Sequence, residues 1–146
     1  MKPLVLLSLI LMFSCKAQQP TWEPIEGLKL LERDGYGPGV EFEARTIKDQ
    51  KSLNQFYSLV NRTRKPGLVV PQVDFQREMV LLIQLGTQQG EKALELSKSA
   101  ESENELTVLV ELKSGKNTDR TIQQPFYLYK MPITDKTVVF REIDRS

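Results

Sequence analysis

The chain has 146 residues, with 20 basic and 19 acidic side chains, one cysteine and no histidine. This composition excludes the Ser-His-Asp, Cys-His and histidine-based zinc sites of many hydrolases. The balanced charge argues against nucleic acid as a partner, because phosphate binding requires an excess of basic side chains on one face. Carboxylate chemistry and a Ser-Lys pair remain as catalytic options, and neither has a recognisable motif here. We therefore expect no enzymatic activity, no cofactor and no metal.

The first 14 residues predict a cleaved signal peptide. Lys2 supplies the positive start, residues 4–13 are apolar, and Ser14 precedes Cys15 at the expected cleavage point. The apolar run is shorter than the roughly 20 residues needed to span a bilayer. Cys15 is the only cysteine and is followed by a polar stretch. We therefore predict that Cys15 is a lipid attachment site, and not a buried free thiol.

The residues around Cys15 resemble a bacterial lipoprotein signal, in which the cysteine becomes the acylated first residue of the mature chain. Met12 and Phe13 replace the leucine and alanine of the usual Leu-Ala-Gly-Cys box. No aspartate follows Cys15, so the resemblance implies anchoring to the cell envelope at the outer membrane, facing the periplasm. Several acyl chains, palmitate among them, would anchor the protein stably, since each buried methylene contributes about 0.8 kcal/mol.

The remaining chain is long enough for one domain. Cleavage before Cys15 leaves 132 of the 146 residues and removes one charge, that of Lys2. A chain of this length buries roughly two-thirds of its unfolded surface. We predict a signal peptide over residues 1–14, a tether over residues 15–27 and a single domain over residues 28–146.

Hydrophobic patterns in the domain predict strands and one convincing helix. The strands are expected at residues 28–32, 40–47, 78–85, 93–98, 105–112, 125–131 and 138–143. The helix is expected from the N-cap Asp49 to Asn61, with apolar residues at positions 53, 56, 57 and 60. Because hairpin-length links dominate, the pattern predicts an α+β fold with a mainly antiparallel sheet of five to seven strands and one packed helix.

Residues 78–85 form the most apolar stretch of the domain, in which the apolar residues from Met79 to Leu85 are interrupted only by Gln84. A half-buried strand would alternate apolar with polar residues, so this run predicts a central strand that is covered on both faces. Asp74 lies shortly before it. A short polar residue in this position favours a local turn with the backbone over a catalytic or ligand role.

Tyr127 and Tyr129 are the candidate partner-binding residues. If Phe126 and Leu128 point to the core, the two tyrosines form a stripe on the opposite face of their strand. Tyrosine is favoured where a surface is partly apolar and partly wet, so the stripe is a candidate contact for a partner. The alternative, which the pattern favours, is that both tyrosines pack within the domain.

A series of landmarks resembles the C-terminal domain of the PrcB family, lipoprotein subunits associated with secreted bacterial protease complexes. They are Arg45-Thr46-Ile47, the helix, Pro71-Gln72-Val73-Asp74-Phe75, Met79-Val80, Gly86, Gln124-Pro125-Phe126 and Met131-Pro132. The resemblance covers roughly residues 45–140. Where members often have a Gly-Gly-Tyr-like sequence, this chain reads Gly90-Glu91-Lys92. The resemblance implies an accessory or assembly subunit without proteolytic activity of its own.

The leading functional hypothesis is a membrane-anchored, non-catalytic module that binds another envelope or secreted protein. A second hypothesis is a small-ligand or glycan binder that uses a concave sheet face at Tyr127 and Tyr129. A third is a carboxylate glycosidase, which requires two acidic groups facing each other across a cleft, roughly 5 to 10 Å apart. A closed pocket would favour the second hypothesis, whereas an exposed edge strand would favour protein binding by strand addition.

Overall fold

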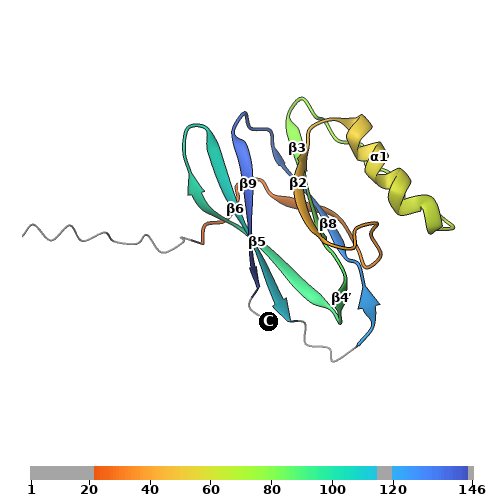
Figure 1. Ribbon diagram of the computed structural model, residues 1–146. Coiled ribbons are helices and arrows are strands. Elements are labelled where there is room, and N and C mark those ends of the chain that lie inside the picture. Colours follow the sequence, from red (N-terminus) through yellow and green to blue (C-terminus); the bar gives the residue numbers. More distant parts are fainter. Residues whose placement is uncertain (1–21, 115–119, 145–146) are drawn as a thin grey trace, which may run out of the picture.

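The computed structural model describes residues 22–114 and 120–144. The signal peptide and Cys15 lie outside the described residues. Most strands belong to two sheets, which lie side by side in Figure 1. The four-stranded sheet has the order β1 (Lys29–Asp34), β8 (Phe126–Pro132), β3 (Glu78–Leu85) and β2 (Phe42–Ile47). The three-stranded sheet has the order β5 (Lys92–Glu101), β6 (Glu105–Ser114) and β9 (Thr137–Asp144).

The predicted α+β class is confirmed, with antiparallel pairs throughout the four-stranded sheet. The strands divide over two main sheets, and a short pair, β4 (Gln88–Gln89) with β7 (Ile122–Gln123), lies between β3 and β8 in the sequence. One long pair, β6 with β9, is parallel. A parallel pair needs a crossover, and here the connecting chain crosses to the other sheet as β8 before it returns.

β3 is the centre of the fold, as its apolar run predicts. Met79, Leu81 and Ile83 point to the core between the two sheets, whereas Val80 and Leu82 point to the helix. All five side chains have no measurable exposure. Gln84, the one polar residue between Met79 and Leu85, is also buried, and its Nε2 donates to Glu43 Oε2 over 2.8 Å. Because both faces of β3 are covered, apolar and polar residues do not alternate along the strand.

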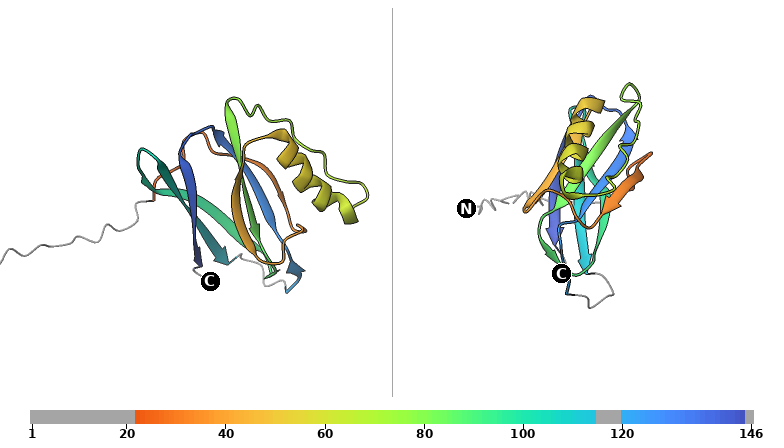
Figure 2. Two further views of the ribbon diagram at one scale, coloured as in Figure 1. Left: turned by 45° about the horizontal axis from the view of Figure 1, so that its top comes forward. Right: turned by 90° about the vertical axis from the view of Figure 1, so that its right-hand side faces the viewer.

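The helix α1 (Gln50–Val60) covers the outer face of the four-stranded sheet, opposite the three-stranded sheet (Figure 2). Asp49 caps it as predicted, because its Oδ1 accepts a hydrogen bond from Ser52 N over 2.7 Å. The four apolar positions predicted to face the core are all buried, and they are Leu53, Phe56, Tyr57 and Val60. The helix continues into the short 3₁₀ helix η1 (Asn61–Thr63).

The segment between η1 and β3 returns along α1 and is held at both helix ends. The Asn61 side chain bonds the backbone of Leu68, accepting from its N over 2.7 Å and donating to its O over 2.9 Å. At the other end, Gln50 Nε2 donates to Pro71 O over 3.2 Å. Asp74 then forms the predicted turn, with its Oδ1 accepting from Gln76 N over 3.2 Å. The local turn predicted at Asp74 is therefore confirmed.

The end of the predicted tether belongs to the folded domain. Glu23 forms an isolated antiparallel bridge with Lys98 of β5, and Ile25 is buried in the core between the sheets. Gly27, with φ +68°, completes a turn in which Leu28 N donates to Ile25 O over 3.3 Å. The ordered domain thus begins before residue 28, because Ile25 contributes to its core.

Candidate functional site

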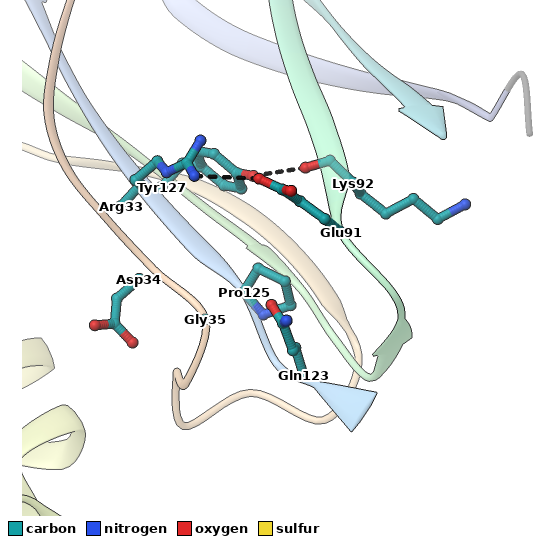
Figure 3. A pocket seen from close by; sticks show the side chains of 8 residues that line it. All are labelled: Arg33, Asp34, Gly35, Glu91, Lys92, Gln123, Pro125 and Tyr127. Carbon is teal, nitrogen blue, oxygen red and sulfur yellow. Dashed lines mark hydrogen bonds and ion pairs between the residues drawn. The ribbon is translucent and has the colours of Figure 1, made fainter. Parts of the chain in front are cut away.

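A surface pocket of about 380 Å³ opens where β1, β5 and β8 come together. Its lining combines charged, polar and small residues from the ends of these strands and from β7 (Figure 3). They are Arg33, Asp34, Gly35, Glu91, Lys92, Gln123, Pro125 and Tyr127. The volume lies near the lower limit of about 300 Å³ for small-molecule sites, which are usually lined by apolar side chains.

Two side-chain contacts connect β1 and β8 to the start of β5 across this pocket. Arg33 Nη2 lies 3.3 Å from Glu91 Oε1, and both side chains are about half exposed. Tyr127 Oη donates to Lys92 O over 3.0 Å (Figure 3). Burial raises the pKa of Tyr127, an effect that the nearby Arg33 opposes. The tyrosine therefore stays protonated at neutral pH and remains a hydrogen-bond donor.

The carboxylate oxygens of Asp34, at one side of the pocket, already accept hydrogen bonds from Arg64 and from the Tyr36 backbone. Arg64 binds both of its oxygens in a bidentate pair, with Nη1 3.0 Å from Oδ2. Tyr36 N donates to Asp34 Oδ1 over 2.7 Å. About four-fifths of each side chain of the Asp34–Arg64 pair is buried. Because its oxygens already accept three hydrogen bonds, Asp34 serves to hold the loop after β1.

The predicted partner-binding tyrosines face the interior. Tyr127 is only 7% exposed and Tyr129 is partly buried, and both pack on the core between the sheets. Their rings stack with centroids 6.4 Å apart. Packing of both tyrosines within the domain, which the sequence pattern favours over an exposed stripe, is therefore confirmed, because the three-stranded sheet covers the face of β8 opposite the helix. A role of Tyr127 and Tyr129 in partner binding stays a prediction. Tyr127 also lines the pocket, where its hydroxyl bonds Lys92 O.

A second feature adjoins the pocket: the outer edge of β5. In an antiparallel pair, the backbone groups of successive residues point alternately toward and away from the partner strand. Lys98 directs its N–H and C=O to Glu23, so it points away from β6. The register with β6 is continuous from Lys92 to Lys98, so Lys92, Leu94 and Leu96 point the same way. The hydrogen bond from Tyr127 to Lys92 O agrees with this alternation, because it shows that the Lys92 carbonyl points away from β6.

We call this row of outward-pointing groups, from Lys92 to Lys98, the β5 edge. Glu23 occupies one end of it and Tyr127 the other. Between them, the backbone groups of Leu94 and Leu96 have no strand beside them in the part of the chain that the structure describes. The β5 edge is therefore a short template for another strand, capped at both ends.

The other sheet edges are less suitable for pairing. β1 has six residues and an irregular register between Leu30 and Glu32. β2 and β9, the edges on the other side of the molecule, lie against each other. An interrupted or covered edge is protected from strand addition. The β5 edge is a regular row that the described residues leave without a hydrogen-bonded neighbouring strand between Glu23 and Tyr127.

The described residues hold few groups suited to other chemistry. Across residues 22–114 and 120–144, no three histidine, cysteine, aspartate or glutamate residues gather where they could hold a metal ion. The same part of the chain contains no helix with the length and apolar character that a membrane crossing demands. The two acids of the pocket, Asp34 and Glu91, are each paired with an arginine.

No family model, curated protein or solved structure matches this chain. The resemblance to the PrcB family thus stays an expectation from the sequence.

Sequence reasoning missed Arg33, Glu91 and the β5 edge. Residues 93–97 alternate small or charged side chains with leucine, which is the pattern of a strand with one exposed face. That signal predicts the exposed face of β5, but it does not show that β5 lies at the edge of its sheet. It could not have placed Arg33 beside Glu91, because they lie 58 residues apart in the sequence.

Proposed function

We propose that this protein is a lipid-anchored, non-catalytic module that binds another protein of the cell envelope. The observation that carries the proposal is the β5 edge, whose central backbone groups at Leu94 and Leu96 have no neighbouring strand among the described residues. Exposed sheet edges bind extended segments through main-chain hydrogen bonds, and side-chain contacts add specificity. The pairing of Asp34 and Glu91 with arginines supports a binding role over acid–base catalysis.

The proposed anchor would keep this edge near the membrane. Cys15 lies seven residues before Trp22, where the described chain begins. Seven residues span at most about 25 Å when fully extended. Because Glu23 is bonded to Lys98, the short tether would restrict the domain to the space next to the bilayer. The anchor at Cys15 and the position at the periplasmic face of the outer membrane are part of the proposal.

The resemblance to the PrcB family suggests the class of assembly. An accessory subunit of a secreted protease complex has no need of catalytic groups, and it does need a surface that holds a second chain. The β5 edge would serve that purpose. We therefore include a protease complex among the assemblies that this module could join.

The alternative is a small-ligand or glycan binder that uses the pocket of about 380 Å³. Its polar groups, Arg33, Glu91 and Gln123, could bond sugar hydroxyls. The ring of Tyr127 is buried, however, so it offers no exposed aromatic face on which a sugar could stack. The ion pair between Arg33 and Glu91 would also have to open. These contacts favour protein binding over the ligand hypothesis.

The proposal is tested by isolating the tagged full chain from its native membrane after mild crosslinking. We expect one protein to be recovered in a constant molar ratio. The Cys15→Ala variant should lose label from a clickable palmitate analogue, leave the membrane fraction and recover much less of the partner. If the membrane-bound wild-type chain recovers no protein in constant ratio, the proposed function is wrong, and glycan and small-ligand screens become the next step.

A further inference from the structure

The β5 edge carries enough detail to define the segment that would bind there. Leu94 and Leu96 each present one N–H and one C=O outward, and two residues of a strand span about 7 Å. The Glu23 bridge at Lys98 is antiparallel. A second strand of the same polarity would continue this ladder in phase, with one residue opposite Leu96, one opposite Glu95 and one opposite Leu94. Three consecutive residues of the partner therefore determine the fit.

The partner residues opposite Leu96 and Leu94 would lie on the inner face of β5. Residues directly opposite each other in an antiparallel pair have their side chains on the same face. The side chains of Leu94 and Leu96 are partly buried and pack against the core between the two sheets. Side chains that extend this layer exclude water best when they are apolar. The inner face thus selects apolar residues at the first and third positions.

The partner residue opposite Glu95 would lie on the outer face, where the surroundings are acidic. Glu95 lies opposite Glu111 of β6, and the Lys113 ammonium contacts both carboxylates. The Glu95 side chain is 59% exposed. Its neighbours two residues away on the same face are small: Ala93 is exposed and Ser97 is buried. Opposite charges across a strand pair attract, so this position selects lysine or arginine.

A second copy of this chain fits the same edge poorly. The two-fold arrangement that pairs Leu94 with the Leu96 of another copy also places Glu95 opposite its own equivalent. Like charges directly opposite each other destabilise a strand pair. The charge at Glu95 therefore favours a different protein over self-association.

We propose that the β5 edge binds an extended segment of another protein in antiparallel orientation, with a basic residue opposite Glu95 and an apolar residue on each side of it. This inference rests on the proposed function and names the partner chemistry at the same site. The segment would lie between Glu23 and the Tyr127 hydroxyl, which limits its regular pairing to a few residues.

The test uses the full chain in detergent and a short synthetic peptide in which arginine lies between two valines. We expect the peptide to slow exchange of the Leu94 and Leu96 amide hydrogens by at least tenfold, measured by NMR. A peptide with glutamate in place of arginine should bind about fivefold more weakly. The Glu95→Lys variant should reverse this preference while leaving the backbone intact.

Leu96→Pro and Leu96→Ala form a matched pair of variants. Both remove the leucine side chain, but only proline removes the outward N–H, and neither change breaks a bond to β6. We expect proline to abolish binding, and alanine to weaken it by less than about fivefold, in chains whose circular dichroism is unchanged. Equal binding to the proline and alanine variants, equal binding of the two peptides, or self-association through this edge would overturn the inference.

A failure of the β5-edge inference can be distinguished from a failure of the proposed protein-binding function. If the native membrane yields a partner equally well from wild type and from Leu96→Pro, protein binding stands and the β5 edge is the wrong site. If wild type yields no partner, the proposed function itself is wrong.

Discussion

Lys98 and Glu23 exchange two backbone hydrogen bonds, with Lys98 N donating to Glu23 O over 2.7 Å and Glu23 N donating to Lys98 O over 3.0 Å. This pair fixes which groups of β5 point away from β6. It also joins the first described residues of the chain to the edge of the three-stranded sheet. Which backbone groups of β5 point outward is therefore determined by a contact between two residues that lie 75 positions apart in the sequence. This alternation can be tested in the free protein, without any partner.

We predict that amide exchange alternates along β5 in the free protein. The N–H groups of Glu95 and Ser97 point toward β6, whereas those of Leu94 and Leu96 point outward. Paired amides exchange only through local opening, so Glu95 and Ser97 should exchange at least about tenfold more slowly than their neighbours. Hydrogen-exchange NMR measures all four. Equal protection would mean that the β5 edge is already covered, and the binding site would have to lie elsewhere.

A second prediction concerns Glu101, at the other end of β5. Its Oε1 accepts a hydrogen bond from Lys136 over 2.6 Å, and its Oε2 accepts one from Lys98 over 3.0 Å. These bonds, that from Lys136 first, lower the pKa of Glu101 from 4.5 to about 2. The folded state is therefore stabilised above the unfolded pKa of about 4.5, and the contribution is lost as the pH falls toward 2.

Glu101→Gln should thus lower the free energy of unfolding at pH 7, and its difference from wild type should shrink between pH 5 and pH 2. The effect will be small because the carboxylate is exposed to solvent. Glu103→Gln, which removes an exposed carboxylate from the same hairpin turn, is the matched control, and its stability at pH 7 should stay close to that of wild type. Urea unfolding at several pH values measures both variants. A constant Glu101→Gln difference down to pH 2 would show that the lysines do not hold this carboxylate.

Tyr57 gives a third prediction. The side chain is fully buried, yet its Oη has no hydrogen-bond partner among the described residues. An unsatisfied buried hydroxyl destabilises the folded state, so Tyr57→Phe should raise the free energy of unfolding by about 1 kcal/mol. Tyr36→Phe is the control, because Tyr36 is 62% exposed and should give no change. Denaturant titration at pH 7 makes the comparison, and a loss of stability in Tyr57→Phe would contradict it.

The same tyrosine has a pH signature. Burial, with a smaller contribution from Glu32, raises the pKa of Tyr57 to about 12. Above pH 10 the unfolded chain ionises at this position before the folded chain does, so stability falls as the pH rises to 12. Tyr57→Phe should lose less stability over this interval than wild type.

The central elements of the fold were predictable because their signals are local. The apolar run of β3 and the Asp49 cap of α1 can each be recognised from fewer than about a dozen consecutive residues, and the structure contains both. The division into two sheets was not predictable, because an inward face of β6 looks the same whether it meets a helix or another sheet. The parallel pairing of β9 likewise depends on a crossover through β8 that no local pattern records.

The candidate site was harder to predict for the same reason. The apolar and aromatic residues on both faces of β8 are equally consistent with two buried faces and with one exposed aromatic stripe. The covering sheet decides between these cases, and it buries Tyr127 to 7% exposure. The β5 edge depends on strand order, which a single sequence does not contain. Residue types could therefore indicate a sheet protein with no histidine and a single cysteine, but they could not locate its open edge.

The fourth prediction concerns Gly86, which ends β3 and turns the chain toward β4 and β5. Its φ is +69°, in the left-handed region that favours glycine, and an added Cβ would lie 2.7 Å from the backbone carbonyl carbon of Glu41. The obstacle is backbone, so it cannot rotate aside as a long side chain could. We expect Gly86→Ala to lower the free energy of unfolding by about 2 kcal/mol or more.

Gly35→Ala is the matched control for this substitution. A Cβ at Gly35 would lie 3.0 Å from Gln123 Oε1, which is the end of a flexible side chain. Gly35→Ala should therefore cost less than about 1 kcal/mol, measured by the same urea titration. Equal stability of Gly86→Ala and wild type would mean that the β3–β4 turn can relax. A turn that relaxes would let the start of β5 move relative to Tyr127, and the hydrogen bond from Tyr127 to Lys92 O would then not hold the β5 edge in place.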